Sequence, residues 1–211
     1  MPQSNPIRYF LLSPANIAGV RGQLLTGSNA RSALAARLRG AGAPLDELFT
    51  FISSLYFRAK LQYARLFATP PPGGCGVFVI TGCGGLLAPD TVVTLQELWG
   101  LSSVDFDPTD PRYRDPIQRD AKRLLQSSSE CEAVLLGSIA TAKYVSPLVE
   151  IFGDRLIFPD EFVGRGDMSR GGLMLRAVES GIELKYTSVG GAIRRGCRPP
   201  KLAPLRRKPV Q

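Results

Sequence analysis

Residues 131–176 read CEAVLLGSIATAKYVSPLVEIFGDRLIFPDEFVGRGDMSRGGLMLR, and they contain two strand–turn–helix units in succession. The apolar runs 133–136 and 155–158 are short enough to be buried strands, and a polar turn marked by glycine follows each of them. Units of this kind are typical of a parallel sheet covered by helices. Ligands of such sheets bind at the carboxyl ends of the strands, so we expect a binding site at these two turns.

Outward from this stretch, three further segments have the pattern of strands. Residues 7–12 and 76–81 are continuous apolar runs, which predict buried strands, and residues 182–189 alternate, which predicts an edge strand. Segments with helical spacing lie between the strands. The prediction is therefore an α/β fold with a mainly parallel central sheet of four to five strands and helices on both faces. We expect one domain over residues 1–193 and a basic tail over residues 194–211.

Polar caps and prolines mark where the helices begin. Residues 44–68 keep a helical spacing, either as one long helix or as two with a break near residues 53–54. Within them we expect Tyr56 and Tyr63 to lie in the core and Lys60 to be solvated. The other expected helices are 30–39 with a cap at Ser28 or Asn29, 95–101 with a cap at Thr94, and a helix from Asp115 or Pro116 to residue 126.

The absence of histidine removes several catalytic systems at once. The 211 residues hold no Ser-His-Asp or Cys-His nucleophile, no HExxH metal site and no imidazole base. The four cysteines form no CxxC pair, which predicts reduced thiols and no zinc site. The aspartates of residues 104–116 lack the spacing of a calcium loop, and neither GxxxxGK[ST] nor GxGxxG occurs. We therefore predict no metal and no cofactor.

The hydropathy of the chain indicates a soluble protein. No apolar run approaches the roughly 20 residues that span a bilayer. The apolar core of the N-terminal segment, residues 9–12, is too short for a signal peptide. We expect a cytoplasmic protein without a membrane partner.

The positive charge is concentrated in a proline-rich tail, residues 194–211, which read RRGCRPPKLAPLRRKPVQ. Of the 26 basic residues in the chain, seven lie in this tail, which leaves 19 against 18 acidic residues in the rest. Such a tail favours phosphate polyanions by a salt-sensitive attraction that does not depend on sequence. An inert, solubilising end is the alternative. The tail residues that we expect to contact nucleic acid are Arg194, Arg195, Arg198, Lys201, Arg206, Arg207 and Lys208.

Four turns rich in glycine and hydroxyl groups follow the four central strands. They share one edge of the expected parallel sheet, where a helix N-terminus also favours an anion. The two arginines of the last turn are suited to bidentate contact with a phosphate or a carboxylate. The candidate ligand-binding residues are Ser13, Thr81, Gly82, Gly84, Gly137, Ser138, Thr141, Lys143, Arg165, Ser169 and Arg170.

Asp167, between those two arginines, is the candidate catalytic residue. Its carboxylate could accept hydrogen bonds from the edge of a nucleobase, or it could act as a general base in catalysis. The structural alternative is that Asp167 caps the following helix and pairs with Arg170 at i+3, just as Ser138 could be only a helix cap. Gly171 and Gly172 cost this helix about 1 kcal/mol each relative to alanine. That cost suggests the close approach of another group, of which a second helix would be one case.

Four segments carry a resemblance to a known fold: YFRAKLQYA (56–64), GLLAPDT (85–91), VLLGSIATAKYVSPL (134–148) and IFPDEFVGRGDMSRGG (157–172). In this order they resemble uncharacterised bacterial α/β proteins and, distantly, the uracil-DNA-glycosylase-like fold over residues 7–178. The resemblance implies a base or nucleotide pocket at the strand ends, sometimes with base flipping. The chain departs from that fold because it has no histidine on a late loop and Ser13-Pro14 where a water-activating acid is expected. The resemblance therefore supports a nucleobase or nucleotide pocket better than base excision.

Three functions fit these observations. The first is a nucleic-acid-associated protein with a nucleobase or phosphate pocket, whose partner is DNA, RNA or a nucleotide. The second is a small-molecule transferase or hydrolase that acts on a nucleoside or an anionic metabolite. The third is a non-catalytic sensor or interaction protein, because no complete catalytic motif is present.

Overall fold

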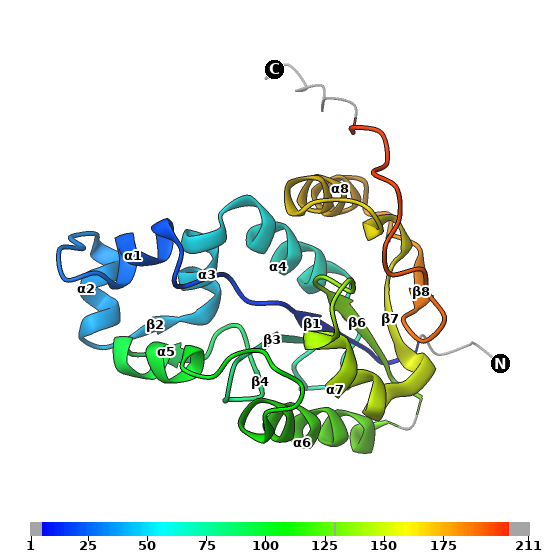
Figure 1. Cartoon of the computed structure of the whole chain (residues 1–211), viewed down its shortest axis with the longest axis horizontal. Helices are drawn as coiled ribbons and strands as arrows, with labels where there is room; N and C mark the ends of the chain where they lie inside the picture. The colour runs from blue at the N-terminus through cyan, green and yellow to red at the C-terminus, as the bar shows by residue number, and fades with distance from the viewer. Residues whose placement is uncertain (1–5, 129, 203–211) are drawn as a thin grey trace.

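The computed structural model describes residues 6–128 and 130–202, and its core is a six-stranded sheet with the strand order β4-β3-β1-β6-β7-β8 (Figure 1). The four central strands are parallel, and the two short edge strands are antiparallel to their neighbours. The strands are β1 (Arg8–Leu12), β3 (Val77–Ile80), β4 (Leu86–Leu87), β6 (Glu132–Leu136), β7 (Leu156–Pro159) and β8 (Tyr186–Ser188), and a separate pair joins β2 (Ala43–Pro44) to β5 (Val92–Val93).

The α/β class and the mainly parallel sheet are confirmed, but the expected number of four to five strands is wrong. The sixth strand is β4, which the sequence reading placed in a glycine-rich turn. Two residues are too few to show an alternation of apolar and polar side chains, so the hydrophobic pattern does not predict this strand. It folds back onto β3 through a turn in which the backbone N–H and the hydroxyl of Thr81 both donate to the Gly85 carbonyl, at 3.0 and 2.9 Å.

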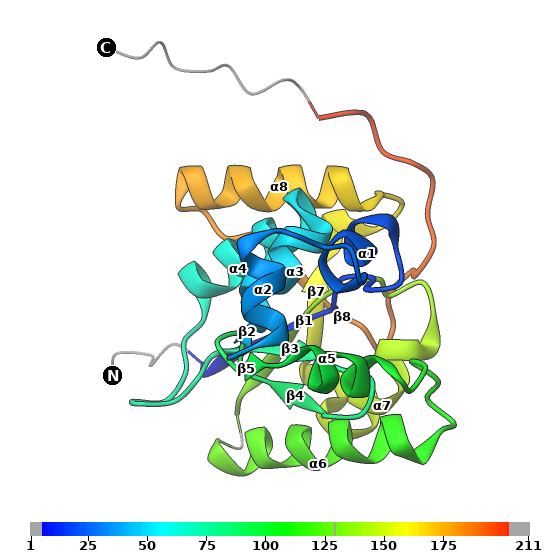
Figure 2. The same ribbon diagram turned by 90° about the vertical axis from the view of Figure 1, so that its left-hand side faces the viewer.

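Two pairs of helices cover the two faces of the sheet (Figure 1). α4 (Leu55–Phe67) and α8 (Asp167–Ser180) lie on one face, and α6 (Pro111–Ser127) and α7 (Ala142–Phe152) lie on the other. Figure 2 shows both layers from the end of the sheet. The strands between them are apolar because both of their faces are buried, and Phe10, Leu11, Leu12, Val134, Leu135 and Leu136 have no exposed surface.

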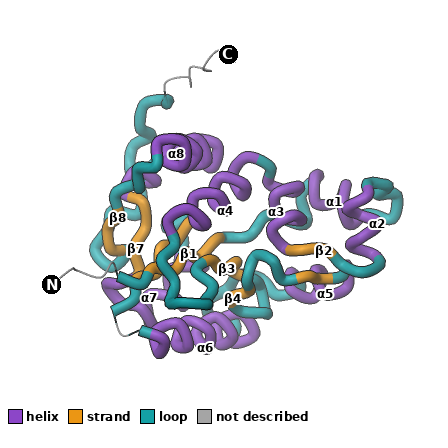
Figure 3. Tube along the Cα trace, turned by 180° about the vertical axis from the view of Figure 1, so that it is seen from behind, coloured by secondary structure: helices purple, strands orange, loops and turns teal. Residues whose placement is uncertain are grey.

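Four shorter helices form a lobe at one end of the sheet. Seen from behind in Figure 3, this lobe lies far from the N-terminal end of β1 and contains the pair of short strands. The helices are α1 (Val20–Thr26), α2 (Ala33–Arg39), α3 (Leu45–Ser53) and α5 (Leu95–Ser102), and the 3-10 turns η1 (Gly153–Arg155) and η2 (Asp160–Phe162) flank β7.

Helix boundaries follow local capping chemistry, and several differ from the sequence prediction. Thr94 caps α5 in a capping box with Glu97, as expected. The cap of α2 is Ser32 and not Ser28 or Asn29, because the Ser32 hydroxyl accepts from the Ala35 N–H. α6 begins at Pro111 and not at Asp115 or Pro116, with Asp110 as its cap. Segment 44–68 is two helices that break at Ser54, where φ is +49°.

α8 packs directly along α4, which explains its glycines. A Cβ atom on Gly171 would lie 2.5 Å from Leu55 Cδ2 and 3.5 Å from Tyr56 Cα. A Cβ atom on Gly172 would lie 3.1 Å from Leu202 Cδ1 of the tail. The close approach that these glycines predict is therefore made by a second helix and by the tail.

The first part of the basic tail runs back past the N-terminal end of α8 (Figure 1). Arg206, Arg207 and Lys208 lie outside the described residues. The four cysteines are free thiols. In residues 6–128 and 130–202, no helix is long and apolar enough to cross a membrane.

Candidate functional site

The site lies where the strand order reverses between β1 and β6. The chain passes from β1 to β3 on one side and later returns to β6 on the other side of β1. The turns that follow β1 and β6 touch each other, because the Ser13 N–H donates to the Leu136 carbonyl at 3.2 Å. A Cβ atom on Gly137 would lie 3.0 Å from Ser13 Cβ, so only glycine fits there without a shift. In open α/β sheets such a reversal is where ligands bind.

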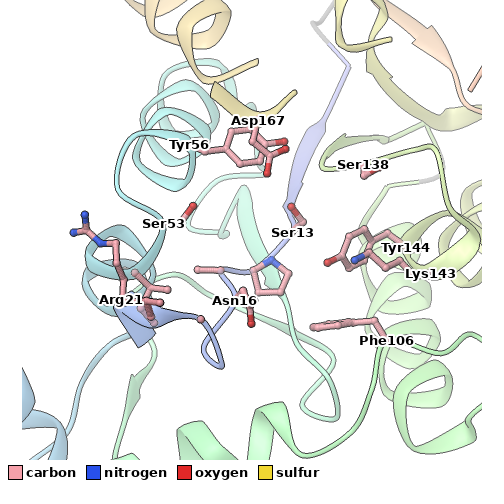
Figure 4. Close-up of a pocket in the computed structure, with 15 residues that line it drawn as sticks. Ser13, Asn16, Arg21, Ser53, Tyr56, Phe106, Ser138, Lys143, Tyr144 and Asp167 are labelled. Carbon is pink, nitrogen blue, oxygen red and sulfur yellow. The ribbon is translucent and has the colours of Figure 1, made fainter. Parts of the chain in front are cut away.

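A cavity of about 640 Å³ opens at this point, and we call it the main cavity. It is bounded by the turns after β1 and β6, by α1, by the junction of α3 and α4, by the loop before α6 and by the start of α8 (Figure 4). Its volume is within the range of pockets for small molecules. The lining includes Ser13, Asn16, Arg21, Ser53, Tyr56, Phe106, Ser138, Lys143, Tyr144 and Asp167.

A buried lysine supports the floor of the main cavity. Lys60 of α4 is 1% exposed, and its ammonium group donates to the Ser13 carbonyl oxygen and, at 2.9 Å, to Ser13 Oγ. The ammonium nitrogen also lies 4.5 Å from the ring centre of Tyr56 and 5.2 Å from that of Phe57. The prediction of a solvated Lys60 is wrong, because Lys60 lies on the same face of the helix as Tyr56 and points at the strand end.

Burial lowers the pKa of Lys60 to about 7, since the charged form loses its hydration. The nearby Asp167 carboxylate opposes this shift, and the Arg170 guanidinium adds to it. The Lys60 amine is therefore partly neutral at physiological pH.

Tyr56 presents a buried hydroxyl to the main cavity. Tyr56 is 7% exposed, and its hydroxyl oxygen has no hydrogen-bond partner of good geometry among the described residues, although the Arg170 guanidinium is near. Burial raises the pKa of Tyr56 to about 12, and Asp167 contributes to the rise. A buried hydroxyl without a partner costs free energy, which a ligand atom could recover.

An aromatic wall closes the opposite side of the main cavity. The Phe106 ring packs edge-on against Tyr113 at 5.3 Å and against Tyr144 at 5.5 Å. The Tyr113 hydroxyl donates to the Lys143 carbonyl at 2.6 Å and so fixes the start of α7. The Lys143 ammonium lies 4.8 Å from the centre of the Tyr144 ring. Burial raises the pKa of both tyrosines, so neither ionises near neutral pH.

Cations outnumber carboxylates around the main cavity. Arg21 and Lys143 line it, and Lys60 and Arg170 lie buried beside it. Among the described residues that line the cavity, Asp167 is the one carboxylate, and it pairs with Arg170 Nη1 at 3.8 Å. The electrostatic balance therefore favours an anionic ligand.

The structure brings four of the predicted site residues together, namely Ser13, Ser138, Lys143 and Asp167, which all line the main cavity. The others lie elsewhere. Thr81 and Gly82 line a neighbouring cavity of about 250 Å³, and Gly84 packs between Thr81 and Leu101. Gly137 lies beneath Ser13, and Thr141 is exposed at the N-cap of α7.

The two helix-start predictions need correction. α7 begins at Ala142, four residues beyond Ser138, so Ser138 does not cap it; the Ser138 hydroxyl accepts from the Ala140 N–H at 3.4 Å. The N-cap of α8 is Gly166 and not Asp167, which is the first helical residue. The expected pairing of Asp167 with Arg170 is present.

Arg165, Ser169 and part of the tail form a second space of about 550 Å³, the basic groove, whose lining also includes Asp167, Arg198 and Lys201. The Arg165 guanidinium donates to the Ser169 hydroxyl and to the Pro200 carbonyl, each at 3.2 Å. Arg170 instead lies 8% exposed against the Phe162 ring, so the two arginines do not face one ligand. Arg194 and Arg195 are exposed outside the groove.

Sequence reasoning missed Arg21, Tyr56, Lys60 and Phe106 as site residues. Tyr56 and Lys60 are four residues apart, so a lysine on the apolar face of a helix was a signal that could have been read. Arg21 reaches the cavity from the lobe, and the glycines on either side of it in the sequence, Gly19 and Gly22, indicate a loop that could approach a ligand. Phe106 reaches the cavity from a loop, and no local sequence pattern predicts this. Within the described part of the chain, no three acidic or cysteine side chains are close enough to hold a metal ion.

Comparison of this chain with protein-family models, with curated proteins and with solved structures finds no match to any of them.

Proposed function

We propose that the protein binds a nucleotide or a nucleobase-containing anion in the main cavity. The observation that carries this proposal is the combination, in one cavity, of three aromatic rings with two lining cations and a single carboxylate. A flat base can stack on Tyr56, Phe106 or Tyr144, and a phosphate can pair with Arg21 or Lys143. The resemblance to the uracil-DNA-glycosylase-like fold implies the same class of ligand.

Each lining cation has a defined support. Arg21 Nε donates to the Phe51 carbonyl at 2.9 Å, which leaves the rest of its guanidinium available to an anion. The backbone of Lys143, at the start of α7, is fixed by the hydrogen bond that the Tyr113 hydroxyl donates to the Lys143 carbonyl. The Tyr56 hydroxyl and the Asp167 carboxylate supply a donor and an acceptor for the edge of a base. Specificity would then come from these polar groups and affinity from stacking and charge.

Calorimetric titration with UMP, AMP and their nucleosides tests this proposal. We expect the nucleotides to bind more tightly than the nucleosides, and Lys143→Met to weaken nucleotide binding about tenfold or more, as expected for the loss of a charge-assisted hydrogen bond. Arg58→Met, which removes an exposed cation from α4, is the matched control and should leave binding unchanged. If neither nucleotides nor nucleosides bind the wild-type protein, the proposal is wrong.

A second candidate function, nucleic-acid binding, is favoured by the position of the basic groove. The groove adjoins the main cavity at Asp167, which lines both, and Arg165, Arg198 and Lys201 give it a positive lining. A single strand with one base in the main cavity could therefore lay its neighbouring phosphates in the groove.

Fluorescence anisotropy with a labelled single-stranded oligonucleotide, measured across salt concentrations, tests the second candidate. We expect the double variant Arg198→Ala/Lys201→Ala to reduce the slope of log affinity against log salt by about 1.4, because two phosphate contacts to a single strand are lost. Arg119→Ala/Lys122→Ala removes two cations from α6 on the other face of the sheet and should leave the slope unchanged. Equal effects of both double variants would exclude a specific role for the groove.

A further inference from the structure

The geometry points to Ser13 and Lys60 as a nucleophile and its general base, which act on a carboxylic ester that carries a negative charge elsewhere in the molecule. Ser13 Oγ and Lys60 Nζ are 2.9 Å apart at the floor of the main cavity. In Figure 4 the Ser13 side chain lies near the centre of the ring of lining residues. Serine–lysine pairs do the work of a serine–histidine pair in some hydrolases. A chain without histidine has few other ways to activate a hydroxyl.

The surroundings of Lys60 fit the role of a base. One of its protons is bound to the Ser13 carbonyl oxygen, which orients the amine toward Oγ of the same residue. Burial lowers the pKa of Lys60 to about 7, so a neutral amine is present at working pH. The Tyr56 and Phe57 rings, at 4.5 and 5.2 Å, stabilise the ammonium that forms when the proton is taken up.

The Ser13 hydroxyl is held at the edge of the cavity by a second contact. While Lys60 is an ammonium that donates to Ser13 Oγ, the Ser13 hydroxyl donates to the Leu136 carbonyl at 3.3 Å, on the side of β6, and Gly137 leaves room for the side chain. When Lys60 loses a proton, the hydroxyl can turn and donate to the neutral amine. Ser53 and Ser138 also line the main cavity, but the described residues place no lysine ammonium within hydrogen-bond distance of either hydroxyl. Ser13 is thereby distinguished from the other serines of the same cavity.

The reaction is balanced without any further reagent than water. The neutral Lys60 amine takes the proton of the Ser13 hydroxyl while Oγ forms a bond to the ester carbonyl carbon. The carbonyl–alkoxy bond then breaks, and the Lys60 ammonium returns its proton to the leaving alkoxide, which departs as an alcohol. Lys60 next takes a proton from water, the hydroxide attacks the acyl carbon, and Ser13 Oγ leaves and recovers the proton. An ester and water thus become an acid and an alcohol.

The charges around the cavity set the substrate class. Arg21 and Lys143 lie on opposite sides of Ser13 (Figure 4), so either of them would hold an anionic group of the ester away from the reacting carbon. The inference concerns the reaction and goes beyond the proposed binding function. It does not need a nucleotide, because any small ester with a carboxylate or phosphate meets the same requirement.

Covalent labelling with a fluorophosphonate, which reacts with activated serines by loss of fluoride, tests the pair. We expect one adduct per chain by intact mass, located on Ser13 by peptide mapping. Ser13→Ala should lose the adduct, and Lys60→Met should label at least about a hundredfold more slowly. Ser28→Ala, which changes an exposed serine outside the main cavity, should label as the wild type does. Calorimetric nucleotide titration of the same samples shows whether the cavity is intact.

A second measurement, on the wild-type protein alone, covers the case in which Lys60→Met does not fold. The labelling rate should rise with pH and reach a plateau above about pH 8, because Lys60 and not the serine hydroxyl is the group that titrates. The groups that face Lys60 are Asp167, Arg170 and Tyr56, and of these Asp167 shifts the plateau to higher pH. No adduct on Ser13, or a rate that rises without a plateau, would overturn the pair. Labelling without nucleotide binding would refute the proposed ligand class alone, and binding without labelling would refute the pair alone.

Discussion

Replacing Lys60 by methionine should change the pH dependence of stability more than any other single substitution in the site. Methionine keeps most of the volume and removes a buried charge. Because the folded state lowers the pKa of Lys60 from 10.5 to about 7, the unfolded chain binds one more proton than the folded protein between these two pH values. The stability of the wild type should therefore rise with pH in this window, by up to about 1.4 kcal/mol per pH unit, and the variant should lack this rise.

The measurement is urea denaturation of both proteins at several pH values from 6 to 9.5. We define the difference as the free energy of unfolding of Lys60→Met minus that of the wild type. This difference should be most positive at low pH, where the wild type must bury a full charge, and should fall as pH rises. The lost hydrogen bonds to Ser13 shift this difference by an amount that does not depend on pH. Arg58→Met on the same helix is exposed and should give a flat difference. A flat difference for Lys60→Met as well would contradict a depressed pKa.

Gly85→Ala should destabilise the fold by about 3–5 kcal/mol, as expected for backbone strain combined with overpacking. Gly85 has a φ of +75°, and a Cβ atom there would lie 2.1 Å from Asp120 Oδ2 and 2.9 Å from the Pro116 carbonyl oxygen. Asp120 cannot simply move away, because its Oδ2 accepts from the Leu86 N–H at 3.0 Å and so ties β4 to α6. The measurement is the free energy of unfolding in urea.

Gly73→Ala is the matched control for Gly85→Ala. Gly73 has nearly the same φ, +73°, but a Cβ atom there would meet nothing within 4 Å. Its substitution should cost only the strain of a left-handed alanine, about 1–2 kcal/mol. If the two substitutions cost the same, the contacts with Asp120 and Pro116 have no effect and the turn before β4 is looser than its geometry indicates.

Most of the sheet could be predicted from sequence because its strands are buried on both faces. The apolar runs around Phe10, Val79, Val134 and Phe158 are continuous, and each coincides with a central strand. β4 could not be predicted in this way, since its two residues are held by the turn at Gly85 and by Asp120 from a distant helix. Long-range contacts, which have no local signature, decide such elements.

The candidate site was predictable only where it follows from topology. Turns at the carboxyl ends of neighbouring parallel strands must lie close together, which is why Ser13 and Ser138 line the same cavity. Lysine ordinarily prefers solvent, which argued against a buried Lys60, although the position of Lys60 on the apolar face of a helix was a signal to the contrary. Arg21 and Phe106 enter the cavity through the packing of a lobe and a loop, which depends on long-range contacts and not on the residues next to them in sequence.

Asp167 stands at the boundary of two positively lined spaces, the main cavity and the basic groove. Because the two spaces adjoin at this residue, charges bound in one are close to charges bound in the other. Two separate small anions, one in each space, would repel each other across Asp167, and each would reduce the affinity for the other by the same factor. One continuous polyanion differs, because the repulsion between its charges is already present before it binds and binding of its second group is intramolecular. A protein that binds two small anions should therefore show weaker binding of each in the presence of the other. A protein that binds one polyanion should show enhanced affinity when the two anionic groups are joined.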